Sequence, residues 1–257
     1  NDYNDYSLYI NHIKNKKFTQ NWTVKMLEEY ILNPLNKALI ILDLGDADCL
    51  VAGASTATSE VIKRSIRIVG VDSKSKWISS SFFLTSPDGS KSYTYADCGV
   101  IPDPDSEQLA SIAYEATNMH KLISGEEPKV AFLSFSTKGS AEHYTVKKIQ
   151  SAMALFSKKY PHILHEGELQ FDAAINKDIA SRKIKNSIIK GDANVFVFPD
   201  LNSANIAYKI SQHLAGFSAW GPLLQGFRKP IHDLSRGCSV NDIICVSAIA
   251  TMQSLLK

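Results

Sequence analysis

Short apolar runs alternate with helical patterns along most of this chain. The runs lie at residues 49–52, 129–135 and 195–198, and each ends in a turn of small or polar residues before a helical pattern begins. Apolar runs of this length, bounded by turn residues, are typical of buried strands. Strands joined through helices pair in parallel, because a parallel connection needs a long crossover. The sequence therefore predicts an α/β fold.

One segment interrupts this alternation. Residues 77–84 and 92–96 both have strand character, and the turn between them contains Pro87, Asp88 and Gly89. Two strands joined by so short a turn form a hairpin and pair antiparallel. We therefore expect some antiparallel pairing within a largely parallel sheet.

Length and composition exclude several classes of protein. The chain has 257 residues, 44% hydrophobic and 21% charged, so it can bury one large core or two moderate ones. A formal net charge of +2 does not favour nucleic-acid binding, which usually shows a clustered basic face. The apolar runs are far shorter than the roughly 20 residues needed to cross a bilayer, and the N-terminus lacks a signal-peptide core. We expect a cytoplasmic protein with no nucleic-acid or membrane partner.

The cysteines and acidic residues do not indicate a metal site. The four cysteines contain no CxxC pair and lie at Cys49, Cys98, Cys238 and Cys245. This fits reduced thiols better than a disulfide framework or a zinc site. Asp46 and Asp48 are close in sequence, but two carboxylates alone are a weak signal for a metal. No metal is predicted.

Two turns between a strand and a helix carry the hydroxyl groups expected of an anion site. The first, residues 53–59, contains Ser55 and Thr56, and on its own it is better explained as a capped helix start. The second, residues 136–140, adds the cation of Lys138 to its hydroxyls. A helix N-terminus with backbone N–H groups and a cation favours a bound anion. The second turn is therefore the stronger candidate.

Ser235, Arg236 and Asp242 place a hydroxyl, a guanidinium and a carboxylate within eight positions, ahead of an apolar helix. The pattern from Ser239 to Asp242 is also that of a capping box, in which the carboxylate only satisfies backbone donors. Arg236 has an equally plain alternative as a surface ion pair. Cys98 and His232 are interpreted as packing or structural residues.

Several segments of the chain resemble phosphate acetyltransferases, within the wider phosphate acetyl/butyryltransferase family. The resemblance covers nearly the whole chain and rests on LGDADCLVAGAST, YADCGVIPDP, FLSFSTKGSAEH, GELQFDAAI, GDANVFVFPDLNSANIAYKISQHL and GPLLQGFRKPIHDLSRGCSVNDI, in this order. It begins partway into the family's first domain.

The resemblance implies a three-layer α/β/α sandwich in two subdomains, similar in outline to isocitrate and isopropylmalate dehydrogenases. Domain I would comprise residues 1–82 with 225–257, and domain II residues 83–224, with the site in a cleft between them. The implied activity is reversible acetyl transfer between coenzyme A and phosphate, which gives acetyl phosphate. The family works without a tightly bound cofactor, since coenzyme A or acetyl-CoA is a substrate. A homodimer is expected.

The resemblance also implies roles for individual residues. Asp242 would take the proton from the coenzyme A thiol, Arg236 would bind phosphate, and Ser235 would stabilise the developing charge. Substrate contacts would come from Ser55, Thr56, Lys63, Arg64, Ser136, Thr137, Lys138, Gly139 and Ser140.

One position departs from the family. Lys63 stands where the family usually has an arginine, and Arg64 is adjacent. A lysine keeps the charge but loses the bidentate fork, so either Arg64 substitutes for the arginine or substrate affinity differs. Two alternatives stay open: a preference for butyryl or another short acyl chain, and a non-catalytic domain that senses acetyl-CoA.

Overall fold

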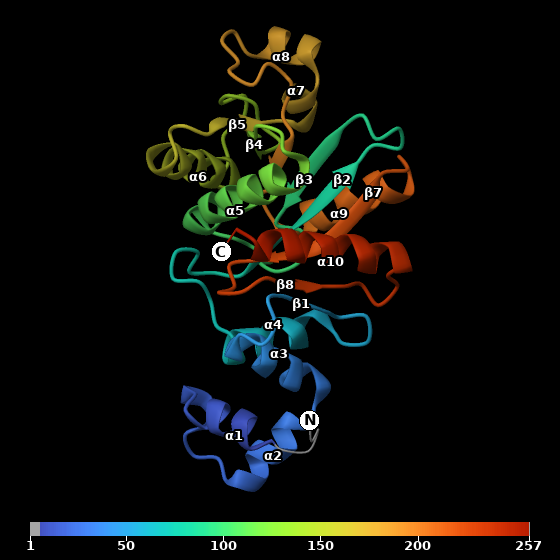
Figure 1. Cartoon of the computed structure of the whole chain (residues 1–257). Coiled ribbons are helices and arrows are strands. Elements are labelled where there is room, and N and C mark those ends of the chain that lie inside the picture. Colours follow the sequence, from blue (N-terminus) through green and yellow to red (C-terminus); the bar gives the residue numbers. More distant parts are fainter. Residues whose placement is uncertain (1–5, 257) are drawn as a thin grey trace. The chain divides into compact units, whose positions relative to one another are not determined.

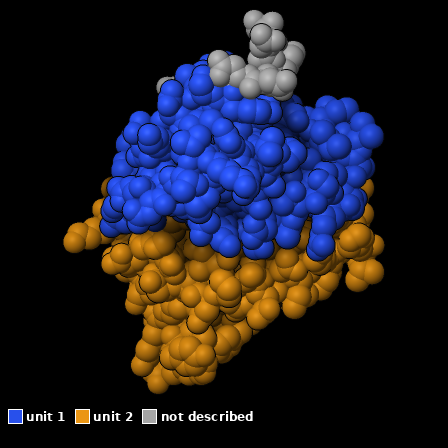
Figure 2. Space-filling view, turned by 90° about the horizontal axis from the view of Figure 1, so that it is seen from below, with its two compact units in different colours: residues 1–76, 226–257 blue, residues 77–225 orange. Residues whose placement is uncertain are grey.

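The computed structural model describes residues 6–256. The chain divides into two compact units, shown in different colours in Figure 2: unit 1 comprises residues 1–76 and 226–257, and unit 2 comprises residues 77–225. Each unit is described by itself. The domain boundaries expected from the sequence, at residues 82/83 and 224/225, stay a prediction.

Unit 2 is built on a six-stranded mixed sheet with the order β5-β4-β6-β3-β2-β7. The first four strands of this order pair in parallel, whereas β2 pairs antiparallel with both β3 and β7. The predicted hairpin is therefore confirmed as β2 and β3. The strands are β2 (Ser79–Thr85), β3 (Ser92–Ala96), β4 (Lys129–Leu133), β5 (Leu164–Leu169), β6 (Val195–Val197) and β7 (Ser218–Gln225).

Helices cover both faces of this sheet (Figure 1). Successive side chains of a strand point to opposite faces, so Val195 and Val197 join one apolar core while Phe196 joins the other. The first core is closed by α5 and α6, and the second by α7 and α9. The helices are α5 (Ser106–Ser124), α6 (Tyr144–Lys159), α7 (Phe171–Ile175), α8 (Lys177–Lys183) and α9 (Leu201–His213).

Unit 1 contains a small parallel sheet of two strands, β1 (Leu50–Ala52) and β8 (Ile231–Asp233). Helix α10 packs against both strands, and α3 and α4 lie on the opposite side of the pair (Figure 1). The helical elements of the unit are α1 (Ser7–Lys14), the 3-10 helix η1 (Lys17–Thr19), α2 (Val24–Ile31), α3 (Pro34–Leu44), α4 (Thr58–Ile68) and α10 (Val240–Ser254).

Local signals explain the bounds of α3. Pro34 occupies the first turn, where its missing N–H is not needed. The side-chain oxygen of Asn33 accepts hydrogen bonds from the N–H groups of Leu35 (3.1 Å) and Asn36 (3.3 Å). Gly45 ends the helix with φ = +96°, a conformation that favours glycine. The bounds of this helix therefore follow from signals that lie within the sequence around it.

The α/β fold with a mixed sheet is therefore confirmed, and three strands were missed. Strands β5, β7 and β8 were not predicted from the sequence. Within residues 6–256, no helix combines the length and the hydrophobicity needed to cross a membrane.

Candidate active site

The carboxyl ends of β1 and β8 bring two of the predicted segments together. The strands are parallel and in register, with Ala52 opposite Asp233. The N–H of Leu234 donates to the carbonyl oxygen of Ala52 (2.7 Å) just beyond the pair. From this edge β1 leads through residues 53–57 into α4, and β8 leads through residues 234–239 into α10. We call these segments the hydroxyl loop and the Arg236 turn.

In the Arg236 turn, hydrogen bonds within the turn hold the backbone, whereas none holds the guanidinium. The N–H of Cys238 donates to the carbonyl oxygen of Ser235 (3.0 Å), and the N–H of Gly237 donates to the Ser235 hydroxyl (3.3 Å). Arg236 itself is exposed, and among residues 6–256 its guanidinium has no hydrogen bond or ion pair. The alternative, a surface ion pair, is therefore not found among the described residues. The guanidinium is available to an anion.

Asp242 begins α10 as a capping box, and only one of its oxygens is used. Its Oδ2 accepts hydrogen bonds from the backbone N–H (2.7 Å) and the hydroxyl (2.9 Å) of Ser239, while the Asp242 N–H donates back to that hydroxyl (3.2 Å). Its Oδ1 has no hydrogen-bond partner in the described part of the chain. A helix cap and a proton acceptor are therefore compatible in the same residue.

The hydroxyl loop carries two further groups without partners. Ser55 is exposed and Thr56 is half-buried, and neither hydroxyl has a hydrogen bond to another described residue. The loop is held by its backbone, since the N–H of Thr56 donates to the carbonyl oxygen of Gly53 (3.2 Å). These hydroxyls are free to meet a ligand at the same sheet edge as Arg236.

Asp233, which the sequence analysis did not single out, lies between the two segments. It is the last residue of β8 and is fully buried. Its Oδ2 accepts a hydrogen bond from the hydroxyl of Thr58, the first residue of α4. Burial raises its pKa to about 6, although the Thr58 hydroxyl and the Leu234 N–H oppose the rise. Its place two residues before the Ser-Arg-Gly turn was the only signal in the sequence.

Lys63 and Arg64 lie farther along α4 and line a different feature. Together with residues of α2 and α3 they surround a cavity of about 360 Å³. Arg64 donates to Glu60 (3.2 Å) and to the side-chain oxygen of Asn36 (3.0 Å). Lys63 is exposed, with its ammonium 3.8 Å from Glu60. Arg64 is thus committed to contacts within unit 1, whereas Lys63 is the more accessible cation.

The turn at residues 136–140 belongs to unit 2, and an internal carboxylate already occupies its donors. Oε1 of Glu168 accepts hydrogen bonds from the Gly139 N–H (2.6 Å) and the Ser136 hydroxyl (3.0 Å). Burial raises the pKa of Glu168, but these bonds and one from Gln150 outweigh it and hold the pKa below its ordinary value.

The other groups of this turn are also engaged. The ammonium of Lys138 donates to the Gly167 carbonyl oxygen (3.1 Å), and it lies 3.4 Å from a carboxylate oxygen of Glu166. The hydroxyl of Thr137 donates to Gln170 (3.2 Å), and the hydroxyl of Ser140 accepts from the Thr137 N–H (3.0 Å). The side chain of Lys138 is about 40% exposed, and its ammonium is the most accessible charge of this turn.

Metal and thiol chemistry receive no support from the described residues. No group of three or more His, Cys, Asp or Glu side chains in residues 6–256 could hold a metal ion. Cys98 is fully buried, and burial with the nearby Asp97 raises the pKa of its thiol well above its ordinary value. A thiol that stays protonated is a poor nucleophile, which agrees with the prediction that Cys98 is a packing residue.

A family model described as phosphate acetyl/butaryl transferase matches residues 1–251. The chain belongs to this family. A phosphate acetyltransferase from Acetivibrio thermocellus is 38% identical over 250 residues, which cover 96% of this chain and 75% of that relative. A phosphate acetyltransferase from Paracoccus denitrificans is 44% identical over 227 residues, covering 86% of this chain and 71% of the relative.

Solved structures of the phosphate acetyl/butaryl transferase family agree. A phosphotransacetylase from Streptococcus pyogenes superposes with a TM-score of 0.92 at 34% sequence identity, covering 100% of this chain and 77% of that chain. A phosphotransacetylase from Staphylococcus aureus gives a TM-score of 0.86 at 37% identity, covering 96% and 75%. The family resemblance inferred from the sequence is confirmed.

Proposed function

We propose that the chain is a phosphate acetyltransferase, an acyltransferase that moves an acetyl group reversibly between coenzyme A and inorganic phosphate. The relatives that match over most of this chain carry this activity in their names. The observation that carries the proposal is the free guanidinium of Arg236, on the turn that enters the helix where Asp242 keeps Oδ1 free. A cation and a proton acceptor at one sheet edge suit a reaction between a thiol and an acyl phosphate.

The chemistry follows from these groups. In the direction that consumes acetyl phosphate, Asp242 accepts the proton of the coenzyme A thiol, and the thiolate forms a bond to the acetyl carbon. The bond between this carbon and the phosphate oxygen breaks, and phosphate leaves with the electron pair. Arg236 neutralises the leaving phosphate, and the Ser235 hydroxyl donates to the carbonyl oxygen as its negative charge develops. Such electrostatic groups are each worth ~100-fold or more in rate.

The remaining predicted residues are proposed as substrate contacts. Ser55 and Thr56 have free hydroxyls for the ligand, and Lys63 offers an accessible charge, whereas Arg64 is tied to Glu60 and Asn36. The turn at residues 136–140 has less support as a phosphate site, because Glu168 holds the donors of Ser136 and Gly139. We therefore propose that it contributes mainly through Lys138.

The finer features implied by the family are also proposals. We propose the dehydrogenase-like three-layer sandwich, a homodimer, a cytoplasmic location and no tightly bound cofactor. Analytical ultracentrifugation tests the dimer.

Arg236→Ala and Asp242→Asn test the site. Each is expected to lower the turnover of acetyl-CoA with phosphate ~100-fold or more, because an oxyanion-type contact or the proton acceptor is lost, while the melting temperature changes little. The matched controls are Arg182→Ala and Asp178→Asn. Arg182 is an exposed arginine, and Asp178 is an acidic residue in the first turn of another helix. Near wild-type turnover in Arg236→Ala and Asp242→Asn would remove the site assignment.

The acyl chain is a separate question, since the family description covers acetyl and butyryl transfer. Acetyl and butyryl groups differ by two methylenes, and a hydrophobic pocket discriminates only modestly between substrates that differ so little. Thiol release from acetyl-CoA and from butyryl-CoA, each with phosphate, decides between them. If neither reacts but acetyl-CoA raises the melting temperature, the chain is a non-catalytic sensing domain.

A further inference from the structure

The carboxyl group of Asp233 is buried without the partners that a buried carboxylate normally has. Asp233 is fully buried, and Oδ1 accepts no hydrogen bond from any residue that the structure describes. A buried acceptor left without a donor is costly, and such groups in native proteins call for an explanation. Asp97, a buried carboxylate of unit 2, shows the usual arrangement, because both of its oxygens accept hydrogen bonds from turn N–H groups.

The contacts of Asp233 reach both segments of the candidate site. Oδ2 accepts the hydrogen bond of Thr58, where the hydroxyl loop enters α4. Oδ1 lies against the backbone of Gly53, where the same loop begins, since a Cβ added to Gly53 would be 2.1 Å from this oxygen. Asp233 itself is followed directly by Leu234 and the Arg236 turn. One carboxyl group therefore touches both ends of the hydroxyl loop from the base of the Arg236 turn.

This placement fixes the loop where ligand contacts are proposed. The loop begins at Gly53 and leads into Thr58, the first residue of α4, and Ser55 and Thr56 lie between them with free hydroxyls. If Thr58 moves, the first turn of α4 moves with it, and so do the N–H groups at the helix N-terminus. Small displacements of groups that orient a substrate have large effects on binding and rate.

We propose that Asp233 is a positioning residue, which holds the hydroxyl loop at a fixed place beside the Arg236 turn through its contacts with Thr58 and Gly53. The proposal rests on the proposed acetyl transfer. Asp233 does not touch the substrate. It acts through Thr58 and Gly53.

The test is a double-mutant cycle on Asp233→Ala and Thr58→Val, with kcat, the KM of each substrate and the melting temperature measured for each variant. Each single variant is expected to raise the KM of at least one substrate about tenfold, because the loop that binds it is no longer held. The KM of the double variant is expected to lie within about twofold of the higher of the two single-variant values, since both changes remove the same contact. Thr58→Ser, which keeps the hydroxyl, is expected to restore the KM.

A control separates positioning from stability. Asp43→Asn also removes a buried carboxylate from unit 1, but it lies in a different network. We expect it to lower the melting temperature without changing either KM at 25 °C. A KM unchanged in Asp233→Ala and Thr58→Val, or effects of the two changes that multiply in the double variant, would overturn the proposal.

Binding of acetyl-CoA by calorimetry distinguishes the failure of this proposal from the failure of the proposed function. If the wild-type chain shows no turnover, the acetyl transfer fails, and the comparison is made on the dissociation constants instead. We then expect each single variant to bind acetyl-CoA more weakly than the wild-type chain. The effects of the two changes on the dissociation constant are not additive in the double variant, and Thr58→Ser restores the affinity. Equal affinity in the wild-type chain, Asp233→Ala and Thr58→Val would reject the positioning role.

Discussion

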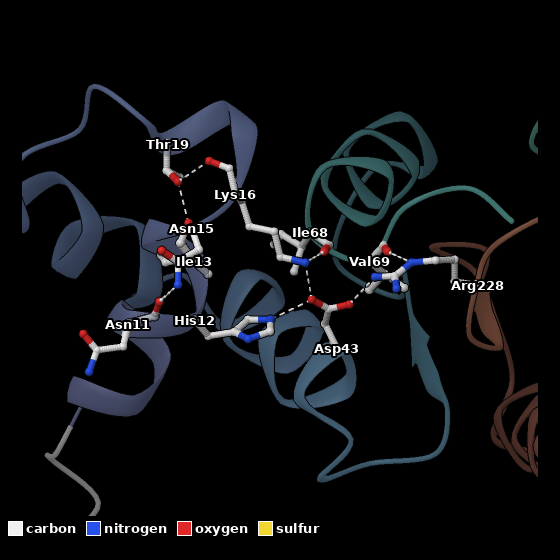
Figure 3. A network of polar contacts seen from close by, with 10 residues as sticks. All are labelled: Asn11, His12, Ile13, Asn15, Lys16, Thr19, Asp43, Ile68, Val69 and Arg228. Atoms are coloured by element: carbon white, nitrogen blue, oxygen red, sulfur yellow. Dashed lines mark hydrogen bonds and ion pairs between the residues drawn. The ribbon is translucent and has the colours of Figure 1, made fainter. Parts of the chain in front are cut away.

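Two carboxylates in unit 1 are largely hidden from solvent and have opposite surroundings. The side chain of Asp43 is 5% exposed, and three nitrogen-bearing side chains converge on it: His12 Nε2 at 2.6 Å, the ammonium of Lys16, and Arg228 Nη2 at 2.6 Å (Figure 3). Asp233 is fully buried and has a single hydroxyl on one oxygen. Asp43 pairs with charged side chains, whereas Asp233 has one hydrogen-bonding side chain and no charged partner among the described residues.

The pKa values follow from this difference. Burial raises the pKa of Asp43, but the hydrogen bonds of Lys16 and His12 and the charges of Lys16 and Arg228 outweigh it and hold the pKa below its ordinary value. For Asp233 no cation opposes burial, and the pKa rises to about 6. A buried ion stabilises a fold only when its partners offset the cost of desolvation. Asp43 meets this condition, and Asp233 does not.

The two carboxylates therefore serve different purposes. Figure 3 shows how Asp43 connects α1, α3 and the segment that carries Arg228, while Lys16 and Arg228 also donate to the carbonyl oxygens of Ile68 and Val69 at the end of α4. That network joins elements far apart in sequence and has no tie to the Arg236 turn. Asp233 lies at the proposed site. Unfavourable burial at such a place indicates a role in function rather than in stability.

Replacing Asp43 with Ala is expected to have the largest effect on stability. It removes the carboxylate that pairs with Lys16 and Arg228 and accepts a hydrogen bond from His12, and breaking a buried ion pair from one side costs about 3 kcal/mol or more. We expect the lower end of that range, because the side chains of His12 and Lys16 are 23% exposed and can be partly hydrated. Urea unfolding at pH 7 measures the change.

Asp172→Ala is the matched control for the Asp43 network. Asp172 is an exposed carboxylate paired with Lys183 at 2.8 Å in unit 2, and loss of a surface pair costs at most about 1 kcal/mol. Equal losses from Asp43→Ala and Asp172→Ala would show that the Asp43 network does not stabilise unit 1.

The pH dependence of stability should have opposite signs at the two carboxylates. The folded pKa of Asp233 is raised, so its contribution to folding is fully present below the ordinary pKa of 3.8 and is lost as the pH rises through about 6. The folded pKa of Asp43 is lowered, so its contribution is present above 3.8 and is lost as the pH falls through the lower folded value.

Asp233→Asn isolates this difference. The free energy of unfolding of the wild-type chain minus that of Asp233→Asn should fall by about 2 kcal/mol from pH 4 to pH 7, because a shift of one pKa unit corresponds to about 1.4 kcal/mol and part of the change already occurs below pH 4. The same difference for Asp43→Asn should stay level between pH 5 and pH 7. Urea unfolding across this range measures both. A level difference for Asp233→Asn would show that its carboxyl group is ionised throughout.

Much of the fold could be predicted because its local signals are strong. The bounds of α3 followed from Pro34 and Gly45, and the hairpin of β2 and β3 from the turn at Asp88. Strand β7 was missed because it contains Gly221 and Pro222, which normally break strands. It tolerates them because it is the edge strand of the sheet, where not every N–H needs a partner in the sheet.

Strand β5 was missed for a different reason. Its sequence, LHEGEL, contains two glutamates, and neither looks like a core residue. In the structure Glu166 and Glu168 are both 2% exposed, and each is satisfied by hydrogen bonds from loops distant in sequence, such as the 2.7 Å bond from Ser187 to Glu166. Burial of a charged residue depends on partners that only the folded chain brings together. Periodicity alone could not reveal it.

The candidate site shows the same limit. The capping box at Asp242 was visible in the sequence, since its two partners are three residues apart. The turn at residues 136–140 looked like the stronger anion site, but its donors meet Glu168, 29 positions after Gly139. Asp233 was not noticed, because its contact with Thr58 spans 175 positions. Residue types in a turn indicate what it can bind, and only the fold indicates what already occupies it.

The smallest expected effect concerns the glycine that faces Asp233. Gly53 and Gly45 both have positive φ, +107° and +96°, so alanine is strained at either position. At Gly45 the nearest atom to an added Cβ is the Lys229 ammonium at 4.0 Å, so only the strain counts. At Gly53 the Cβ would meet Asp233 Oδ1 at 2.1 Å and the Leu234 backbone at 2.7 Å. Gly53→Ala should therefore cost about 1–2 kcal/mol more than Gly45→Ala, the range typical of overpacking.

The Asp233→Ala background separates the two causes of this excess. Removing the carboxyl group relieves the 2.1 Å contact but leaves the 2.7 Å contact with the Leu234 backbone. If the carboxyl group rests on Gly53 as proposed, the excess cost of Gly53→Ala over Gly45→Ala shrinks in this background without disappearing, as contacting residues are not additive. Urea unfolding of Gly53→Ala and Gly45→Ala, each in the wild-type and in the Asp233→Ala chain, measures this excess cost. An excess of the same size in both backgrounds would mean that only the Leu234 backbone excludes a side chain at Gly53, and Asp233 would then hold the hydroxyl loop through Thr58 alone.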